Sequence, residues 1–421
     1  MHRRAGLAKF WVIAPAVASV LASATPATAG GFYAPYQSGL AIGSAMAGCS
    51  ARSDDAGFFF CNPATITGLD GATATIEARG YVPSIRIDAK NATSPLGADL
   101  TSAGSSGEMT TPLGAPGGFA ALPITRNLWL GIGVSGHFAV DIEADPGWAG
   151  RFQLLKSDMR GINLSSALAW RVADWLTIAA GVQAQRFSVA LEKSELIPTM
   201  FGPVEARGYL RGSDWALGGV AGVLLSPLPG TRIGIGYKSP LTHDVRGTAG
   251  AELPGLPADG ARFDVALPEI VSAGIEQRVT PTLRLFGEVQ WVNWSRFKGF
   301  DISFASGRPN ELRPQVWEDT WMGAIGLGWT VLPGTEITAG VHYDTPVTKG
   351  GTNTLSPDGA RTMIAAGINQ RVGERGMVSV YYGHVLFEDA PVNAASLTSG
   401  TLTGTFKGSL DLFGASLKLT W

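Results

Sequence analysis

The sequence predicts an all-β transmembrane barrel of about 14 antiparallel strands, with an N-terminal hatch segment that plugs the lumen. Apolar residues recur at every second position through much of the chain, and short connections alternate with long ones. After residue 29, no apolar run approaches the roughly 18 residues that a membrane helix needs. Because the chain is 45% hydrophobic and only 16% charged, its apolar residues are spread over alternating strands, as is typical of such barrels.

The first 29 residues have the pattern of a secretory signal peptide. A basic start precedes an apolar stretch at residues 10–21 and a small-x-small site at residues 27–29. The apolar stretch is too short to span a bilayer. We therefore predict that residues 1–29 are removed on export and that the mature chain begins at Gly30.

Residues 30–70 precede the first convincing strand and are rich in Gly, Ala and Ser. Their only helical periodicity lies at residues 38–47. A barrel of this size has a lumen that either conducts water or is filled. We therefore predict that residues 30–70 form a hatch and residues 71–421 the barrel. A flexible periplasmic tail is the alternative, although a tail needs neither three phenylalanines nor an Asn-Pro turn.

Three groups in this segment are candidate functional residues. Two acids would anchor the hatch to arginines, namely Arg52 or arginines of the barrel, and three phenylalanines would offer apolar surface at the floor of a pocket. An Asn-Pro-Ala turn would deliver the hatch to the first strand, since Asn can bond its own backbone and Pro cannot extend a ladder. A solvated loop is the alternative for the acids, and simple packing for the phenylalanines. The candidates are Asp54, Asp55, Phe58, Phe59, Phe60, Asn62, Pro63 and Ala64.

The remaining composition limits the chemistry. Cys49 and Cys61 are the two cysteines of the chain, and in an oxidising compartment they form either a disulfide or two free or buried thiols. The five histidines lie far apart and show no metal-ligand spacing, so we expect neither a metal nor another cofactor. The formal net charge of −2 gives no indication of nucleic acid binding.

Period-two patterns identify individual strands along the chain. They lie at residues 72–82, 128–134, 176–185, 283–291, 335–344 and 413–421. Within the second of these regions, Gly136, His137 and Phe138 interrupt the alternation. A Gly inside a strand often marks a bulge or a bend, and an ordinary strand end is the alternative.

The connections fall into two length classes, as in outer-membrane barrels with short periplasmic turns and long outer loops. The Pro-Gly turns at Pro229 and Pro333 are near copies and suit tight type II turns. An even number of strands places both chain ends on the periplasmic side. Short turns are expected at residues 126–127, 173–174, 229–230, 280–281, 333–334 and 373–376, and long loops at 88–114, 144–157, 194–206, 249–260, 304–316, 346–359 and 389–404.

Aromatic residues near the predicted strand ends fit the girdles that mark the two membrane interfaces. A soluble β-sandwich or a secreted adhesin is the alternative architecture, but a sandwich would carry more surface charge. Its turns would not sort into two length classes. The girdle candidates are Trp129, Trp170, Trp175, Trp291, Trp294, Trp321, Trp329 and Tyr343.

Two sets of residues form a pattern that extends over essentially the whole mature sequence. They are Ser38, Gly39, Leu40, Ala47, Gly48, Asp54, Asp55, Ala56, Asn62, Pro63, Ala64 and Leu69 in the predicted hatch, and residues 129–139, 147–151, 267–270 and 291–295 in the predicted barrel. In this pattern the chain resembles the FadL-type outer-membrane transporters of long-chain fatty acids and hydrocarbons. It departs from the commoner pattern at Cys49, Cys61 and the three phenylalanines.

The resemblance implies passive uptake of a hydrophobic compound. The ligand would be captured at an outer groove, would occupy an apolar internal pocket, and would leave sideways at a kinked third strand, which we place at Gly136, His137 and Phe138. It also implies a monomer that needs no cofactor and lies among outer-membrane lipid and lipopolysaccharide. The strand ending at Trp421 would engage the barrel-assembly machinery.

Other functions remain as alternatives. An outer-membrane enzyme would need a nucleophile with a positioned His or acid, and no such signature is present. An open porin fits poorly with low charge and a plug, whereas a structural or adhesive barrel remains open. A carboxylate ligand would want a basic residue in the pocket, and strand parity offers Arg160, Arg171, Arg232 and Lys238.

Overall fold

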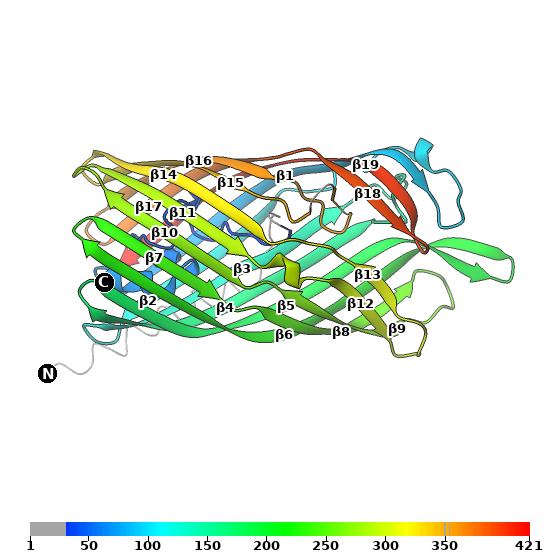
Figure 1. The fold of residues 1–421 in the computed structure, drawn as a ribbon, viewed down its shortest axis with the longest axis horizontal. Coiled ribbons are helices and arrows are strands. Elements are labelled where there is room, and N and C mark those ends of the chain that lie inside the picture. The colour runs from blue at the N-terminus through cyan, green and yellow to red at the C-terminus, as the bar shows by residue number, and fades with distance from the viewer. Residues whose placement is uncertain (1–30, 349–350, 353) are drawn as a thin grey trace.

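The computed structural model describes residues 31–348, 351–352 and 354–421, so the predicted signal peptide and Gly30 lie outside the described residues. The chain forms one closed antiparallel barrel of 14 strands (Figure 1). This confirms the predicted architecture and strand number. Its strand segments are β1 (Thr73–Thr93), β2 (Leu113–Pro123), β3 (Leu128–Glu143), β4 (Lys156–Ala173), β5 (Leu176–Thr199), β6 (Gly202–Leu228), β7 (Thr231–Lys238), β8 (Leu241–Ala251), β9 (Asp259–Leu267), β10 (Ile270–Arg278), β11 (Leu283–Val292), β12 (Gly299–Phe304), β13 (Glu311–Pro314), β14 (Thr320–Leu332), β15 (Thr335–Asp344), β16 (Arg361–Val372), β17 (Gly376–Phe387), β18 (Ala390–Ser396) and β19 (Gly400–Thr420).

Several barrel strands are interrupted midway and therefore count as two segments each. β7 continues as β8 beyond Pro240, and β9 continues as β10 beyond Pro268. A proline has no N–H to give to a ladder, so a strand breaks where one falls. The other interrupted pairs are β11 with β12, β13 with β14, and β17 with β18.

The barrel closes where β1 pairs with β19, from Thr73 opposite Thr420 to Thr93 opposite Thr401. Helical structure is confined to short pieces, and no helix in the described part of the chain is long and apolar enough to cross a membrane. These pieces are α2 (Gly39–Ile42) and the 3₁₀ turns η1 (Ala56–Phe60), η2 (Pro63–Gly68), η3 (Thr101–Ala103) and η4 (Trp294–Arg296).

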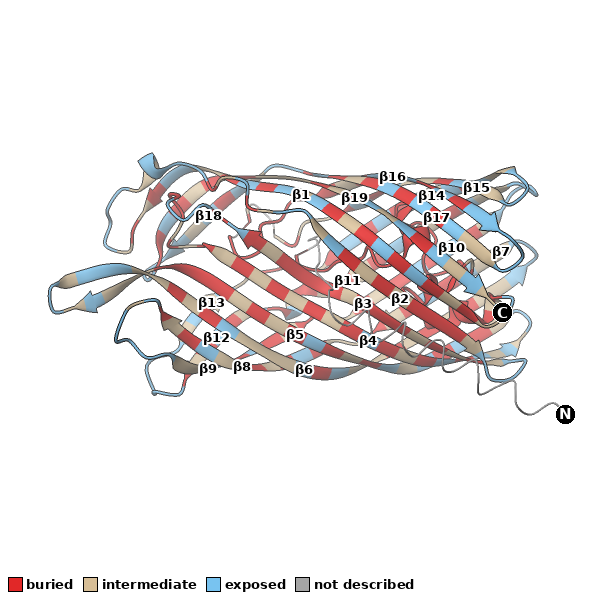
Figure 2. Ribbon diagram, turned by 180° about the vertical axis from the view of Figure 1, so that it is seen from behind, coloured by how far each residue is buried: buried red, intermediate tan, exposed pale blue. Residues whose placement is uncertain are grey.

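Exposed and buried residues alternate along the strands of the wall, as the bands in Figure 2 show, and many of the exposed side chains are large and apolar. On β16 and β17, Ile364, Ile368 and Val380 face outward and are exposed, whereas Asn369 and Ser379 are buried. Such an arrangement is stable when lipid covers the apolar face. The period of two that identified the strands is thus the signature of a barrel wall between lipid and a polar lumen.

Two predicted long loops are wrong. Residues 194–206 form a tight hairpin in which Thr199 pairs with Gly202, and residues 389–404 form the hairpin of β18 and β19. In the first ribbon, charged side chains such as Glu195 and Glu205 fall within the strands. Where both faces of a ribbon meet polar surroundings, the alternation that reveals a strand is lost.

The predicted helix at residues 38–47 is largely wrong as well. Only Gly39–Ile42 is helical, because Ala45 and Met46 have φ angles of 51° and 69°. Left-handed backbone at two successive residues cannot continue a right-handed helix.

Two girdle candidates are also wrong. Trp129 and Trp294 are buried, whereas Trp170, Trp175 and Trp329 are exposed on the outside of the wall. Trp294 belongs to an aromatic cluster with Phe32 and Trp317, and inward burial of this kind removes it from the lipid interface.

Candidate functional site

Residues 31–70, hereafter the lumen segment, lie inside the barrel, where the blue part of the chain runs in Figure 1. Every residue from 31 to 69 is buried except Asp54 and Gly68, which are partly exposed. Glycines of the wall make room for it. A Cβ atom at Gly234 or Gly236 would overlap the backbone carbonyl oxygens of Ser50 and Cys61, so the segment packs directly on the backbone of β7.

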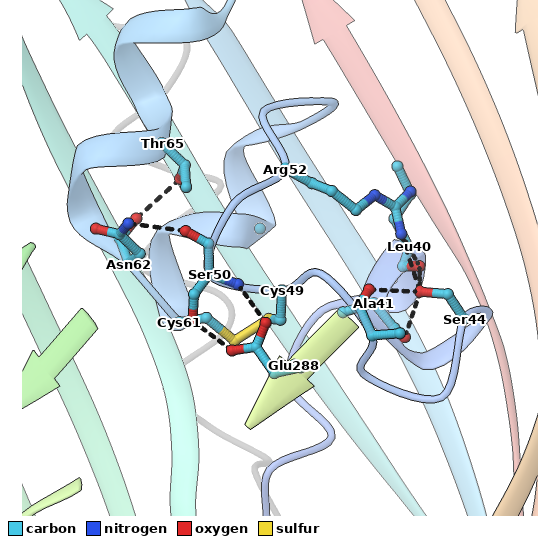
Figure 3. Close-up of a disulfide and its surroundings, with 12 residues drawn as sticks. Leu40, Ala41, Ser44, Cys49, Ser50, Arg52, Cys61, Asn62, Thr65 and Glu288 are labelled. Carbon is cyan, nitrogen blue, oxygen red and sulfur yellow. Dashed lines mark hydrogen bonds between the residues drawn. A yellow bond between two sulfur atoms is a disulfide. The ribbon is translucent and has the colours of Figure 1, made fainter. Parts of the chain in front are cut away.

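A disulfide joins Cys49 to Cys61 within the lumen segment (Figure 3). Beside it, the Glu288 carboxylate of β11 accepts hydrogen bonds from the Ser50 backbone N–H at 3.0 Å and from the Ser50 hydroxyl at 2.5 Å. A buried carboxylate is stable only when such donors satisfy it. The disulfide and Glu288 together hold this loop of the segment against the wall.

Asn62 has the position predicted for the turn. Its side-chain oxygen accepts from the Ala64 N–H at 3.0 Å and caps η2, which Pro63 opens. Its side-chain N–H group donates to the carbonyl oxygens of Ser50, at 2.8 Å, and Val223 of β6, at 2.9 Å. One amide side chain therefore orders the turn and ties it to both the segment and the wall.

Asp54 lies between two arginines. Its carboxylate is 2.8 Å from Arg52 and 2.8 Å from Arg284 of β11, and Arg284 also contacts Glu276 and Glu336. Burial alone would raise the pKa of Asp54, but the charges of Arg284 and Arg52 outweigh burial and lower it from its ordinary value.

Asp55 differs from its neighbour. One carboxylate oxygen caps η1 by accepting from the Gly57 N–H at 2.7 Å, and the other has no hydrogen-bond partner among the described residues. Burial raises the pKa of Asp55 to about 6, against the opposing effects of the Gly57 hydrogen bond and the charge of Lys418.

The three phenylalanines have different neighbours. Phe58 is covered by the Arg52 guanidinium, 4.7 Å from the ring centroid, and Phe59 packs where Gly131 and Gly133 leave β3 without side chains. Phe60 lies 4.9 Å from the His137 ring. Phe58 thus packs within the lumen segment, while Phe59 and Phe60 face the third strand, β3.

The third strand carries a bulge at the predicted position. Gly136 pairs with Ile162 of β4 but Phe138 pairs with Gly161, so His137 is an extra residue. The other edge of β3 pairs with β2 only as far as Val134, opposite Gly118. A strand rises about 3.3 Å per residue, so the β2–β3 ladder between Pro123 and Gly118 is shorter than the roughly 25 Å apolar band of a barrel wall. The ladder therefore ends within this band.

The lumen segment bonds to β3 where β2 does not. The Ala34 N–H donates to the His137 carbonyl oxygen at 2.8 Å, and the Ala139 N–H donates to the Phe32 carbonyl oxygen at 2.6 Å. The Gly136 N–H donates to the Gln37 side chain at 3.0 Å. Over residues 135–142, therefore, β3 hydrogen-bonds to the lumen segment instead of to β2, its neighbour in the wall. We call this stretch, residues 135–142 of β3 facing residues 110–117, the open seam.

A small cavity lies behind the open seam. Its volume is about 10 Å³, and its lining brings together predicted residues from separate parts of the chain, including Phe59, Phe60, Pro63 and His137, with Lys238 of β7. A cavity of this size holds about one water molecule. Asp54 and Asp55 are not part of its lining.

A larger cavity of about 360 Å³ lies toward the end of the barrel that carries the β5–β6 ribbon. Apolar side chains such as Leu191, Ile197 and Phe304 share its lining with Lys193, whose ammonium is 3.1 Å from Glu311. Its walls come from β5, β6, β8, β9, β12 and β13. It combines apolar surface with fixed charges, which suits an amphiphilic molecule.

Sequence reasoning missed several residues that hold the site together. Glu288 and Arg284 contact the lumen segment across more than two hundred positions of sequence, and Phe32 supplies a backbone bond to β3. Glu288 and Arg284 could have been found from the sequence, because each is a charged residue at an inward-facing position of an alternating strand. No group of three or more potential metal-ligating residues occurs in the described part of the chain.

A closed barrel with an apolar outer face and a filled lumen defines a class, that of outer-membrane β-barrel proteins. The chain matches the family described as outer membrane protein transport protein (OMPP1/FadL/TodX) over residues 20–421. The chain therefore belongs to this family, whose members are outer-membrane transport channels rather than enzymes.

Relatives align over nearly the full length. A Neisseria meningitidis serogroup B sequence named as an outer membrane protein is 26% identical, covering 92% of this chain and 93% of the relative. The long-chain fatty acid transport protein of Escherichia coli O6:H1 is 24% identical, covering 87% of this chain and 88% of the relative.

Solved structures share the fold. A Pseudomonas aeruginosa FadL homologue superposes with a TM-score of 0.84 at 20% identity, covering 93% of this chain and 99% of that one. The Ralstonia pickettii toluene transporter TbuX gives a TM-score of 0.67 at 18% identity, covering 91% and 98%. At these identities the likeness establishes the fold.

Proposed function

We propose that the protein takes up hydrophobic compounds, and long-chain fatty acids in particular, passively across the outer membrane. The supporting observation is the open seam. There the ladder between β2 and β3 ends inside the apolar band, and the lumen segment hydrogen-bonds to β3 in place of β2. Such a seam has no use in a purely structural barrel, because unpaired backbone is costly in lipid. It suits a barrel that releases apolar cargo sideways.

The route has three stages. The 360 Å³ cavity captures the compound at the outer end, where each buried CH₂ contributes about 0.8 kcal/mol. The lumen segment acts as a hatch and blocks direct passage to the periplasm. Movement of residues 32–34 away from β3 then opens the seam beside Gly136, His137 and Phe138 to the bilayer.

The proposed function also implies where the barrel lies and how it is assembled. The barrel lies as a monomer among outer-membrane lipid and lipopolysaccharide, and its last strand engages the barrel-assembly machinery. Trp421 is suited to that engagement because it is partly exposed and extends the final pairing by donating its N–H to the Ala72 carbonyl oxygen at 2.9 Å.

Uptake of a labelled long-chain fatty acid tests the proposal in cells that lack their own transporter. Cells with this protein should take up more label than cells with an empty vector. Replacing Asn62 and Pro63 with Ala-Ala should abolish the gain without loss of inserted barrel, because Asn62 ties the turn to β6. A matched control replaces Met200 and Phe201 at the exposed tip of the β5–β6 hairpin with Ser-Ser and should retain uptake.

Deleting residues 31–70 separates transport from an adhesive or structural role. A plugged transporter should become leaky to polar solutes or inactive, whereas an adhesive barrel should keep its binding. No uptake by a folded, surface-inserted wild-type barrel would reject fatty acids as the cargo.

A further inference from the structure

A groove of about 540 Å³ lies on the outer face of the wall, where β9 and β12 part. These two strands pair at only two positions, one of which is Arg262 opposite Ser303. The remaining residues of β9 pair with β8 alone, and those of β12 pair with β13 alone. The buried rings of Phe263 and Phe300, 5.2 Å apart, meet across the gap. They close the groove toward the lumen, so the groove opens outward.

Basic side chains outnumber acidic ones in the lining of this groove. Alternate residues of β9 are buried, so the charged ones between them project outward from the wall. Neither Arg296 nor Lys298 takes part in an ion pair among the described residues. We call the site the basic groove. Its charged residues, all of them exposed, are Arg262, Arg296 and Lys298 with Asp264 and Asp301.

A further arginine lies directly beside the basic groove. Arg246 of β8 is the pairing partner of Arg262, and the two guanidiniums lie 2.7 Å and 2.5 Å from the same carboxylate, that of Asp244. Both side chains nevertheless stay largely exposed, at 71% and 63%. Like charges directly opposite each other weaken a sheet, and one carboxylate balances only one of these two arginines. An anion from outside the protein would complete the balance.

The basic groove lies just beyond the outer edge of the apolar band. Trp291 and Trp321 are opposite each other on β11 and β14, and both are at least partly exposed on the outside of the wall. Aromatic residues in such positions mark the membrane interface. Arg296 and Lys298 follow Trp291 by a few residues, and β9, β12 and β13 lie toward the end of the barrel opposite the C-terminus (Figure 1). At this level the outer leaflet presents its head groups.

Apolar side chains continue from the basic groove toward the membrane. Leu312 of β13 is part of the lining and is exposed. Val316, four residues further along the descending chain, is exposed as well. Apolar groups exposed next to a polar site mark a surface that a partner covers. A ligand with phosphate groups above and acyl chains below fits both parts, whereas a free phosphate ion would use only the charged part.

We propose that the basic groove, with Arg246 beside it, binds lipopolysaccharide, the phosphate-bearing glycolipid of the outer leaflet. Arginine pairs with phosphate oxygens through two parallel hydrogen bonds, and lysine adds a point charge. The acyl chains lie along the wall at Leu312 and Val316. This site does not depend on which compound the barrel transports, so it goes beyond the proposed function and stands or falls separately from it.

The outer ends of β3 and β4 have the opposite balance of charge. There three acids surround two bases in a network of ion pairs. Acids in excess repel phosphate groups, and this network adjoins the open seam. β4, β5, β6 and β8 lie between β3 and β9, so the lipid is held well away from the seam. The residues of this network are Asp141, Glu143 and Asp158 with Lys156 and Arg160.

Binding of defined lipids to the purified protein tests the assignment. The probe is lipid A, the acylated and phosphorylated part of lipopolysaccharide, and it is compared with lipid A stripped of its phosphates and with phosphatidylglycerol. Native mass spectrometry measures the bound fraction in neutral detergent, with EDTA present so that no bridging cation contributes. The test variant is Arg262→Gln with Lys298→Gln. The matched control, Lys156→Gln with Arg160→Gln, also removes one arginine and one lysine from the outer face.

The wild type should bind phosphorylated lipid A about tenfold more tightly than either other lipid, because only this lipid satisfies both the charges and the apolar surface. The test variant should lose most of this preference, and the control should keep it. Equal binding of the phosphorylated and stripped lipids, no loss in the test variant, or equal losses in both variants would overturn the site. Equal binding of phosphatidylglycerol would show that any anionic lipid suffices and would overturn the assignment to lipopolysaccharide.

Folding of each variant is checked by its mobility on an unheated gel. All four substituted side chains lie on the outer face, so both variants should fold. Should the test variant fold poorly, Arg246→Gln with Arg296→Gln takes its place and should lose the same preference. A folded form of this second variant that keeps the preference would also overturn the site.

Discussion

Two pairs of strands show opposite ways of building the wall. β5 and β6 stay paired without interruption from Leu176 opposite Leu225 to Thr199 opposite Gly202. β2 and β3 pair only from Gly118 opposite Val134 to Pro123 opposite Trp129. The first pair holds its shape by its own ladder, whereas the second depends on Phe32 and Ala34 of the lumen segment.

The difference teaches where the molecule can move. Backbone hydrogen bonds within the β5–β6 ladder can break only if the barrel unfolds, because no other group replaces them. The bonds from β3 to the lumen segment can break while every wall ladder remains intact. The proposed opening is therefore confined to one seam, and its free energy depends on how firmly the lumen segment is docked.

Deleting His137 should have the largest effect on this comparison. Without the extra residue, β3 would pair with β4 in one continuous register and would lose the bulge that lies at the open seam. Fatty acid uptake should fall to the level of cells without the protein.

The control deletes Lys90, which lies at a comparable irregularity between Ala89 and Asn91 on the closed β1–β19 pair. Uptake should survive that deletion. Full uptake by a well-inserted His137 deletion would show that the bulge plays no part in release.

The variant Cys49→Ser with Cys61→Ser should have the next largest effect. Removing a cross-link that closes a loop of sequence separation 12 should weaken docking of the lumen segment by about 3 kcal/mol. The measurement is the urea concentration at which trypsin cleaves at Arg52. Wild type incubated with reductant is the control and should stay protected, because both cysteines are buried; equal protection of the variant would contradict the prediction.

Asp54→Asn should loosen the same docking by less, about 1 kcal/mol. The variant loses the ion pair with Arg284 in a partly exposed setting, but Arg284 keeps Glu276 and Glu336. The trypsin assay in urea reads this change too. Glu205→Gln, which removes an ion pair with Arg151 outside the lumen, should leave the cleavage midpoint unchanged, and a larger shift for Glu205→Gln than for Asp54→Asn would refute the anchoring role.

Asp55→Asn should change docking in the opposite direction. Burial raises the pKa of this acid from 3.8 to about 6, so the docked state holds the proton more tightly than the free segment. Docking should weaken by about 2 kcal/mol as the pH rises from about 4 to 6. The amide keeps the bond to the Gly57 N–H and carries no charge, so the variant should be docked more firmly than the wild type at pH 7 and should lose this pH dependence.

Cleavage by a protease with little pH dependence, followed across that range, measures the slope. Wild type and Asp55→Asn with the same slope would assign the titration to another group.

The sequence was informative where a residue's environment repeats. Ile364, Ala366 and Ile368 are exposed at every second position, so the strand pattern was visible without any knowledge of distant contacts. The bulge at His137 was also visible, because Gly136 interrupts a local alternation. The ribbon at residues 194–206 was missed because its charges remove the alternation.

Long-range partners could not be read from the chain. Whether Cys49 meets Cys61 depends on the path of the intervening loop, and the choice of Glu288 as the acceptor for Ser50 depends on barrel register. Lys238 was one of four equivalent basic candidates by parity. Arg160 and Arg232 form ion pairs and Arg171 donates to the Thr67 carbonyl oxygen, and these contacts form only after the wall has closed.

The open seam also bears on self-association. A strand edge without a partner is a template to which a second copy can add a strand, and natural sheets protect such edges. Here the edge of β2 carries Pro116, which brings no N–H, and the edge of β3 is occupied from within by the lumen segment. A barrel can thus carry a stretch of wall without a ladder in a crowded membrane without offering its neighbours a strand edge to which they can add.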